Sequence, residues 1–306
     1  MRFGLDTAQQ RMTWAENVSR VQLAEDLGFD GVWGFDHFQP MYGEGPGECF
    51  EGQTTLAAWS GVTERIRLGL LVAGLTYRHP SVYAAELITI DHASGGRVEC
   101  SYGAAWFAEE HGRLGIDFPD VRERVDAFEE AVQIVRGLLT TDGFTFEGRH
   151  YAVRDATMHP RSVQRPHPPI IIGGFGARRT PMLAARHAAE FNLPFADLET
   201  FGTALARVDA ACQAIDRDPV TMLRSVALCV ACGEDEDEVD RRATAAGHDP
   251  TGLREYGLAG TPDQVVAKIE TYRAASAQSV YLQVLDLDDL EHLDLIAARV
   301  LPEVSS

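Results

Sequence analysis

The chain has 306 residues, a length at which an α/β barrel can form one structural unit. Its 27 Lys and Arg residues against 46 Asp and Glu give a formal net charge of -19, which repels nucleic acid and anionic membrane surfaces. Hydrophobic residues make up 45% of the chain and charged residues 24%, which excludes a disordered protein. We therefore predict no nucleic-acid or membrane partner, and an anionic ligand would need a local basic or helix N-terminal site.

The cysteines and the N-terminus indicate a cytoplasmic protein. Cys229 and Cys232 lie three residues apart in a strand-like run, so they face opposite sides and make a poor metal or redox clip. The odd total of five cysteines is typical of free thiols in a reducing compartment. The first ten residues lack the apolar run of a signal peptide, and no stretch approaches a membrane span.

Eight apolar, strand-like runs alternate with helical segments along the chain. The runs span residues 2–6, 31–36, 66–73, 97–103, 168–174, 189–194, 223–231 and 279–285. Helical periodicity is clear in the intervening residues 14–28, 121–139 and 261–275.

Strict alternation of strands and helices implies a parallel sheet covered on both faces, and eight such units close into a (β/α)8 TIM barrel. We expect one domain over residues 1–306. A doubly wound open sheet is the alternative, but it usually carries a Gly-rich nucleotide loop after the first strand, where "GLDTAQQ" has none.

Two stretches interrupt the alternation. Residues 104–119, after the fourth strand, are too long and aromatic for a simple connection. Residues 145–153, "TFEGRHYAV", predict a short β-hairpin that turns at Gly148 before the fifth strand. Such excursions at the carboxyl end of a barrel usually shape a pocket.

Asp36 and His37 stand where the second strand, "GVWGFD", ends. Groups at the carboxyl ends of barrel strands converge on one mouth, where catalysis takes place. An imidazole gains or loses a proton near neutral pH, and an adjacent carboxylate can orient it. His37 is therefore a candidate acid or base, although it could instead cap a loop carbonyl.

The third strand ends in small residues around Val72, Ala73 and Gly74. These residues would leave room for a flat ligand in the mouth. Plain barrel packing explains them equally well.

The segment "PPIIIGGFGARRT" predicts a phosphate site. A buried strand leads into Gly173, Gly174 and Gly176, and Arg178 and Arg179 then open a helix. Free backbone amides, a helix N-terminus and guanidinium groups suit a phosphate. A tight turn with arginines in solvent is the alternative, and the dinucleotide fingerprint is incomplete because Arg179 stands at its third glycine.

No metal is predicted. The first strand ends in "LDTAQQ" without a His-x-His pair, and "EEH" at residues 109–111 lacks the spacing of zinc proteases.

Stretches spread over nearly the whole chain carry a family resemblance. They are "GVWGFDHFQP", "RIRLGLLVAGLTYRHPSVYA", "GGRVECSYGAAWFAEEHGRLGIDFP", "FEGRHYAV", "RPHPPIIIGGFGARRTPMLAARHAAEFN", "GTPDQVV" and "YLQVLDLDDLEHL". With them the chain resembles the luciferase-like monooxygenase superfamily, and specifically its coenzyme F-420-dependent oxidoreductase branch.

The resemblance implies a TIM barrel that binds the deazaflavin ring in its mouth and the cofactor phosphate at Gly173, Gly174, Gly176, Arg178 and Arg179. His37 would be the proton donor or acceptor, and Asp36 would belong to the cofactor wall. A non-proline cis peptide between Leu71 and Val72 would press against the back of the ring. In the segment after the fourth strand, Gly103 would belong to the cofactor site, Trp106, Glu109 and Glu110 would border the ring and substrate space, and Glu109 would be catalytic.

The implied function is hydride transfer between coenzyme F-420 and a small organic substrate. Two alternatives stay open: an FMN-dependent monooxygenase that uses reduced flavin and dioxygen, and a flavin- or deazaflavin-binding protein without catalysis. The resemblance leaves the substrate and the direction of reaction open, and a homodimer is a possible assembly.

Overall fold

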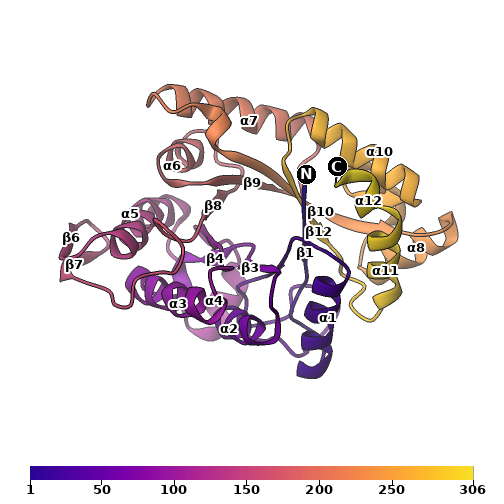
Figure 1. Cartoon of the computed structure of the whole chain (residues 1–306), viewed down its shortest axis with the longest axis horizontal. Helices are drawn as coiled ribbons and strands as arrows, with labels where there is room; N and C mark the ends of the chain where they lie inside the picture. The colour runs from indigo at the N-terminus through magenta and orange to yellow at the C-terminus, as the bar shows by residue number, and fades with distance from the viewer. Residues whose placement is uncertain (306) are drawn as a thin grey trace.

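Nine parallel strand segments occupy eight positions of a nearly closed barrel in the computed structural model, which describes residues 1–305 (Figure 1). The strand order is β3-β2-β1-β12-β10-β9-β8-β5-β4. The two edge strands, β3 and β4, are consecutive in the chain and together make up the third strand of the barrel. A parallel bridge between Leu68 and Val98 connects the two edges. The predicted TIM barrel is confirmed.

The barrel strands correspond to the eight predicted runs. They are β1 (Arg2–Asp6), β2 (Gly31–Gly34), β3 (Arg67–Leu70) with β4 (Ala73–Gly74), β5 (Cys100–Gly103), β8 (Ile170–Gly173), β9 (Glu190–Pro194), β10 (Leu223–Cys232) and β12 (Ser279–Gln283). A further strand, β11 (Leu258–Gly260), pairs only with β10.

Helices surround this sheet. The main ones are α1 (Trp14–Asp26), α2 (Gly52–Val62), α3 (Pro80–Ala93), α5 (Val121–Thr140), α6 (Arg179–His187), α7 (Leu198–Gln213), α8 (Glu236–Ala245), α10 (Pro262–Ala274) and α11 (Leu290–Arg299). Short ones are α4 (Ala108–Leu114), α9 (Pro250–Tyr256), α12 (Leu301–Val304), and the 3-10 turns η1 (Leu75–Tyr77) and η2 (Pro219–Thr221). Thr13 begins α1 with a reciprocal capping box to Glu16, and Asp120 and Asp197 cap α5 and α7. No helix among residues 1–305 is both long and apolar enough to cross a membrane.

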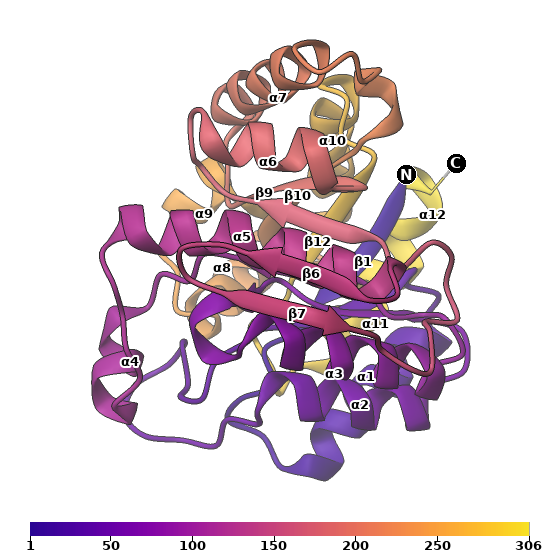
Figure 2. The ribbon, with the colours of Figure 1, turned by 90° about the vertical axis from the view of Figure 1, so that its left-hand side faces the viewer.

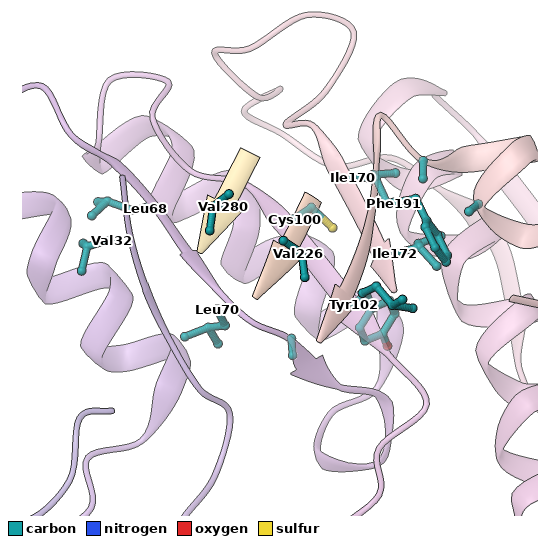
Figure 3. Packing of buried hydrophobic residues seen from close by; sticks show 14 of the residues in the cluster. Val32, Leu68, Leu70, Cys100, Tyr102, Ile170, Ile172, Phe191, Val226 and Val280 are labelled. Atoms are coloured by element: carbon teal, nitrogen blue, oxygen red, sulfur yellow. The ribbon is translucent and has the colours of Figure 1, made fainter. Parts of the chain in front are cut away.

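Alternate strand residues point outward and pack against the helices, because side chains in a strand change face at every residue. Figure 3 shows this outer core, which includes Val32, Leu68, Cys100, Ile170, Val226 and Val280. All of these side chains are at most 1% exposed.

The intervening residues fill the barrel interior. At its amino end Arg2 donates to Glu99 and Glu190, both at 2.7 Å, across the barrel. Above this ion cluster Trp33 packs edge-on against Tyr281, with ring centroids 4.6 Å apart. The lower barrel is therefore a packed core, and chemistry is confined to its carboxyl end.

The two excursions shape the rim. The hairpin of β6 (Phe144–Glu147) and β7 (Ala152–Ala156) is antiparallel and lies beside α5, as Figure 2 shows. It is confirmed as predicted. Residues 104–119 contain α4, whose Glu110 contacts His37 and Tyr77. The Leu71–Val72 peptide bond is cis, as the resemblance implied, and it separates β3 from β4.

Candidate functional site at the carboxyl end of the barrel

His37 lies just after β2, at the carboxyl end of the barrel, in an aromatic environment. Its ring stands edge-on to Trp106 and Phe107, with centroids 5.9 Å and 5.7 Å away. The side chain is 12% exposed. Such a half-buried imidazole can still meet a ligand.

Glu110 holds the imidazole from α4. Its Oε2 lies 3.1 Å from Nδ1 of His37, and its Oε1 accepts hydrogen bonds from the N–H groups of Phe38 at 2.7 Å and Gln39 at 2.9 Å. The Tyr77 hydroxyl also donates to Oε2. The loop that carries His37 is therefore fixed by one buried carboxylate.

These contacts determine the ionisation of Glu110 and the tautomer of a neutral His37. Burial of Glu110 disfavours its charged form, but hydrogen bonds from His37, Tyr77 and the Phe38 amide outweigh burial and lower the pKa of Glu110. Because an ionised carboxylate can only accept, the proton of a neutral His37 sits on Nδ1. Nε2 has no hydrogen-bond partner among residues 1–305 and is free for proton exchange with a ligand.

Glu109, predicted as a catalytic residue, is placed elsewhere by the fold. Its side chain is 59% exposed and pairs with Arg113 at 2.5 Å on the outer face of α4. The next residue along the helix, Glu110, turns inward with His111. The carboxylate beside His37 is thus one position further along the chain than predicted, and the catalytic role of Glu109 stays a prediction.

His111, next to Glu110 on α4, contacts Thr76 and Tyr77 of η1. Its ring stacks on Tyr77 at 4.6 Å, and its Nε2 lies 2.6 Å from Oγ1 of Thr76. Tyr77 and His111 were not predicted as site residues, and Glu110 was predicted to border the ring and substrate space but not to contact His37. The spacing of Phe107, Glu110 and His111 at i, i+3 and i+4 is the signal that marks the inner face of α4.

Asp36 lies behind the mouth wall. It is 2% exposed, accepts from the Gly74 N–H at 2.8 Å, and binds the Arg78 guanidinium through both oxygens at 2.6 Å and 2.9 Å. Asp36 thereby supports the backbone that follows the cis peptide. Burial disfavours the charged Arg78, but Asp36 and Glu51 outweigh it and raise the pKa of Arg78.

Glycines allow close packing at the carboxyl ends of β5 and β8. A Cβ on Gly103 would stand 2.7 Å from Cγ2 of Val72, and one on Gly173 would stand 2.3 Å from the Asn192 carbonyl oxygen. Leu71 and Val72 are half-buried beside this wall, whereas Trp106 is 65% exposed at the rim. The cis peptide residues Leu71 and Val72 and the backbone of β5 and β8 therefore form one closely packed wall, which suits a flat ring.

The glycine-rich turn separates the two predicted arginines. Arg179 pairs with Asp126 at 2.6 Å and Glu129 at 2.7 Å on α5, while Arg178 has no ion pair among the described residues. No side chain caps the N-terminus of α6. Gly174, at a φ of 123°, and Gly176 line a cavity of about 230 Å³ that also contacts Thr200 and Arg207 of α7. Free amides together with Arg178 fit a phosphate at this turn.

Among residues 1–305, no group of three or more His, Cys, Asp or Glu side chains could hold a metal ion. The arrangement therefore combines three elements: an oriented imidazole, a flat wall and an anion-binding turn. Together they suit a ring cofactor with a phosphate next to an acid–base group.

The sequence is similar to oxidoreductases that use either of two cofactors. It is 34% identical over 189 residues to an F-420-dependent glucose-6-phosphate dehydrogenase of Microbacterium testaceum, covering 61% of this chain and 55% of that protein. It is 30% identical over 168 residues to an FMNH(2)-dependent dimethylsulfone monooxygenase of Pseudomonas putida, covering 54% and 46%. The chain thus spans about half the length of these curated relatives.

The fold is shared with a coenzyme F-420-dependent tetrahydromethanopterin reductase from Methanopyrus kandleri. The TM-score is 0.83 at 20% identity, over 98% of both chains. Residues 1–251, which contain His37, Glu110, the cis peptide and the glycine-rich turn, match the luciferase-like monooxygenase family. The chain therefore belongs to the luciferase-like monooxygenase family.

Proposed function

We propose that this protein is a coenzyme F-420-dependent oxidoreductase that exchanges a hydride with a small organic substrate. The observation that carries the proposal is His37, held through Nδ1 by Glu110 with Nε2 free at the mouth. The names of relatives such as the Microbacterium testaceum dehydrogenase support the cofactor.

The cofactor would be held by groups on three sides. Arg178 and the open N-terminus of α6 would take its phosphate, and Leu71, Val72 and Gly103 would back its ring. Trp106 would border the ring at the rim. When bound, the deazaflavin supplies a ring carbon that accepts or returns a hydride.

His37 performs the proton half of the reaction. With an alcohol as substrate, Nε2 of His37 would accept the O–H proton, while the bound deazaflavin would supply the hydride acceptor. In the reverse direction Nε2 returns that proton to the carbonyl oxygen. The negative charge of Glu110 stabilises the imidazolium that forms, and Phe38 and Gln39 anchor Glu110 so that the ring keeps its orientation.

An FMN-dependent monooxygenase is the second candidate, because the Pseudomonas putida relative uses reduced FMN. The turn around Arg178 would suit the FMN phosphate equally well. The two functions differ in what the cofactor passes on: a deazaflavin transfers hydride, whereas reduced FMN activates dioxygen.

Parallel titrations with oxidised F-420 and FMN, followed by tryptophan fluorescence, test the proposal. We expect the protein to bind F-420 with a dissociation constant in the micromolar range or below, and FMN at least about tenfold more weakly. Selective binding of FMN would move the protein to the monooxygenase function. If F-420 binds but no substrate in a broad screen is turned over, the protein is a binder without catalysis.

A further inference from the structure

A cavity lies beside the glycine-rich turn, between α6 and α7. Residues 174–176 of the turn line one side, and Thr200, Thr203 and Arg207 of α7 line the other. These three α7 residues follow one another at intervals of three and four, so they share one face of the helix. The two helices pack side by side, as Figures 1 and 2 show.

The size of this cavity fits one part of a ligand. Its volume is about 230 Å³. Sites that enclose a whole drug-sized molecule typically have about 300–1,000 Å³, so the cavity is too small for a ring cofactor. Because residues 174–176 belong both to the cavity and to the turn proposed for the phosphate, the part it holds would be the one that follows the phosphate.

Arg207 supplies the positive charge of the cavity. Its side chain is exposed and has no ion pair or hydrogen bond among residues 1–305. Arg179, on the neighbouring helix, is by contrast held by Asp126 and Glu129. A guanidinium group without a partner can bind a carboxylate through two parallel N–H groups.

Thr203 and Glu199 add two further polar groups without partners. The Thr203 hydroxyl makes no hydrogen bond in the described part of the chain, whereas Thr140 and Thr244 donate to the carbonyl oxygen four residues earlier in their helices. Glu199 also lines the cavity and has no ion pair within residues 1–305. It stands eight positions before Arg207, about 12 Å away along the helix axis, so the two charges are presented separately.

This set of groups fits an acylated glutamate better than a simple anion. A simple anion would meet the Glu199 carboxylate as well as Arg207. A glutamyl unit would instead donate its amide N–H to Glu199, while its carboxylates accept from Arg207 and from the Thr203 hydroxyl. Phe175, which is 58% exposed beside the cavity, would cover the methylene groups of such a unit.

Coenzyme F-420 contains this unit next to its phosphate. The phosphate is esterified with lactate, and the lactyl group is joined to glutamate through an amide bond. FMN ends at its phosphate and has no group for the cavity.

We propose, resting on the function proposed above, that the cavity between α6 and α7 binds the first glutamyl unit of the F-420 tail, and that Arg207 is the residue that selects for it. The phosphate is left to Arg178 and the turn. The cavity thereby favours glutamylated F-420 over every cofactor that ends at the phosphate.

Titrations with deazaflavins that differ only in the tail test the proposal. The ligands are glutamylated F-420, the phospholactyl form without glutamate, and the deazaflavin 5′-phosphate, with FMN in parallel, each followed by tryptophan fluorescence. We expect glutamylated F-420 to bind at least about tenfold more tightly than either shorter deazaflavin. The difference should narrow as the salt concentration rises, because Arg207 is exposed.

An arginine variant assigns the preference to the cavity. Arg207→Ala should weaken binding of glutamylated F-420 by about tenfold and leave the dissociation constants of the 5′-phosphate and of FMN unchanged. Arg186→Ala is the matched control, because Arg186 is exposed on α6, has no ion pair among the described residues and does not line the cavity. It should keep the full preference.

The outcomes separate this inference from the proposed function. If glutamylated F-420 and the two shorter deazaflavins bind equally well, the cavity does not hold the tail, while dependence on a deazaflavin still stands. Equal losses of affinity in Arg207→Ala and Arg186→Ala would likewise overturn the assignment of Arg207. If FMN binds and no deazaflavin does, the proposed function fails and this inference fails with it.

Discussion

Nδ1 of His37 lies 3.1 Å from Oε2 of Glu110, although the two residues are 73 positions apart in the chain. One comes from the end of β2 and the other from a short helix inserted after β5. The carboxylate fixes which ring nitrogen carries the proton and leaves Nε2 without a hydrogen-bond partner among residues 1–305.

Replacement of His37 by Ala tests the proton transfer. Proton transfer by a positioned side chain contributes typically about 10²–10⁴-fold, so we expect kcat to fall by that factor. The dissociation constant for the cofactor should change by less than about threefold, because the phosphate turn and the ring wall remain. A variant that keeps its full kcat would remove His37 from the mechanism.

Replacement of Glu110 by Gln tests its positioning role. The amide keeps the shape and can still accept from Nδ1, but it loses the negative charge that favours a protonated imidazole. We expect kcat for alcohol oxidation to fall by about tenfold while the melting temperature stays unchanged. A purely structural role would lower the melting temperature and leave kcat of the folded variant unchanged.

Glu109→Gln is the control on the same helix. Glu109 is exposed and paired with Arg113, and an exposed pair of this kind contributes at most about 1 kcal/mol to the free energy of unfolding. We expect kcat and its pH profile to match the unmodified protein. A loss of kcat as large as in Glu110→Gln would restore the predicted catalytic role of Glu109.

This pair shows what the sequence could and could not predict about the site. The position of His37 followed from one rule, that catalytic groups of a barrel stand where a strand ends. The choice between Glu109 and Glu110 depends on how the seven-residue helix α4 is rotated about its axis. Two consecutive acidic residues do not indicate which of them faces the barrel. Arg178 and Arg179 were ambiguous for a similar reason, since only the position of α5 shows which one is already paired.

The same limit applies to the fold. Apolar runs identified all eight barrel positions, because parallel strands are buried on both faces. The division of the third strand into β3 and β4 falls at the cis peptide between Leu71 and Val72, where the resemblance implied a bulge. The pairing of β11 with β10 was not predicted, since it depends on local backbone geometry beside an apolar segment.

Replacement of Arg178 by Ala should weaken binding of the cofactor by about tenfold, the loss of one charge-assisted contact to phosphate. The effect should be larger at low salt than at high salt, because the site is open to solvent. Arg179→Ala serves as the comparison: its side chain is held by Asp126 and Glu129, so we expect a small loss of stability and little change in affinity. Equal effects of the two variants at both salt concentrations would contradict this assignment.

Replacement of Gly173 by Ala should destabilise the barrel. The new Cβ would stand 2.3 Å from the carbonyl oxygen of Asn192, a backbone atom that cannot move without disturbing β9. We expect the free energy of unfolding, measured in urea, to fall by about 2–3 kcal/mol. Gly202→Ala is the control: Gly202 lies within α7 with no atom near its Cβ position, so it should gain about 0.5–1 kcal/mol. A Gly173→Ala protein as stable as the unmodified chain would show that the wall tolerates a side chain.

Asp6 makes the stability of the fold depend on pH. Burial raises the pKa of Asp6 from 3.8 to about 7, and the hydrogen bond from Gln283 only partly opposes this. Between these values the folded protein keeps a proton that the unfolded chain has released, so the free energy of unfolding falls as pH rises through this window. Asn at this position does not ionise and can still accept from Gln283.

We therefore expect Asp6→Asn to gain stability relative to the unmodified protein as pH rises from about 4 to about 7, by roughly 2–4 kcal/mol in total, and to keep a constant advantage above that range. Urea unfolding at several pH values measures the difference. Asp294→Asn, on the exposed face of α11, is the control and should show a difference that stays nearly level. Parallel stability curves for Asp6→Asn and the unmodified protein would mean that Asp6 is ionised in the folded state.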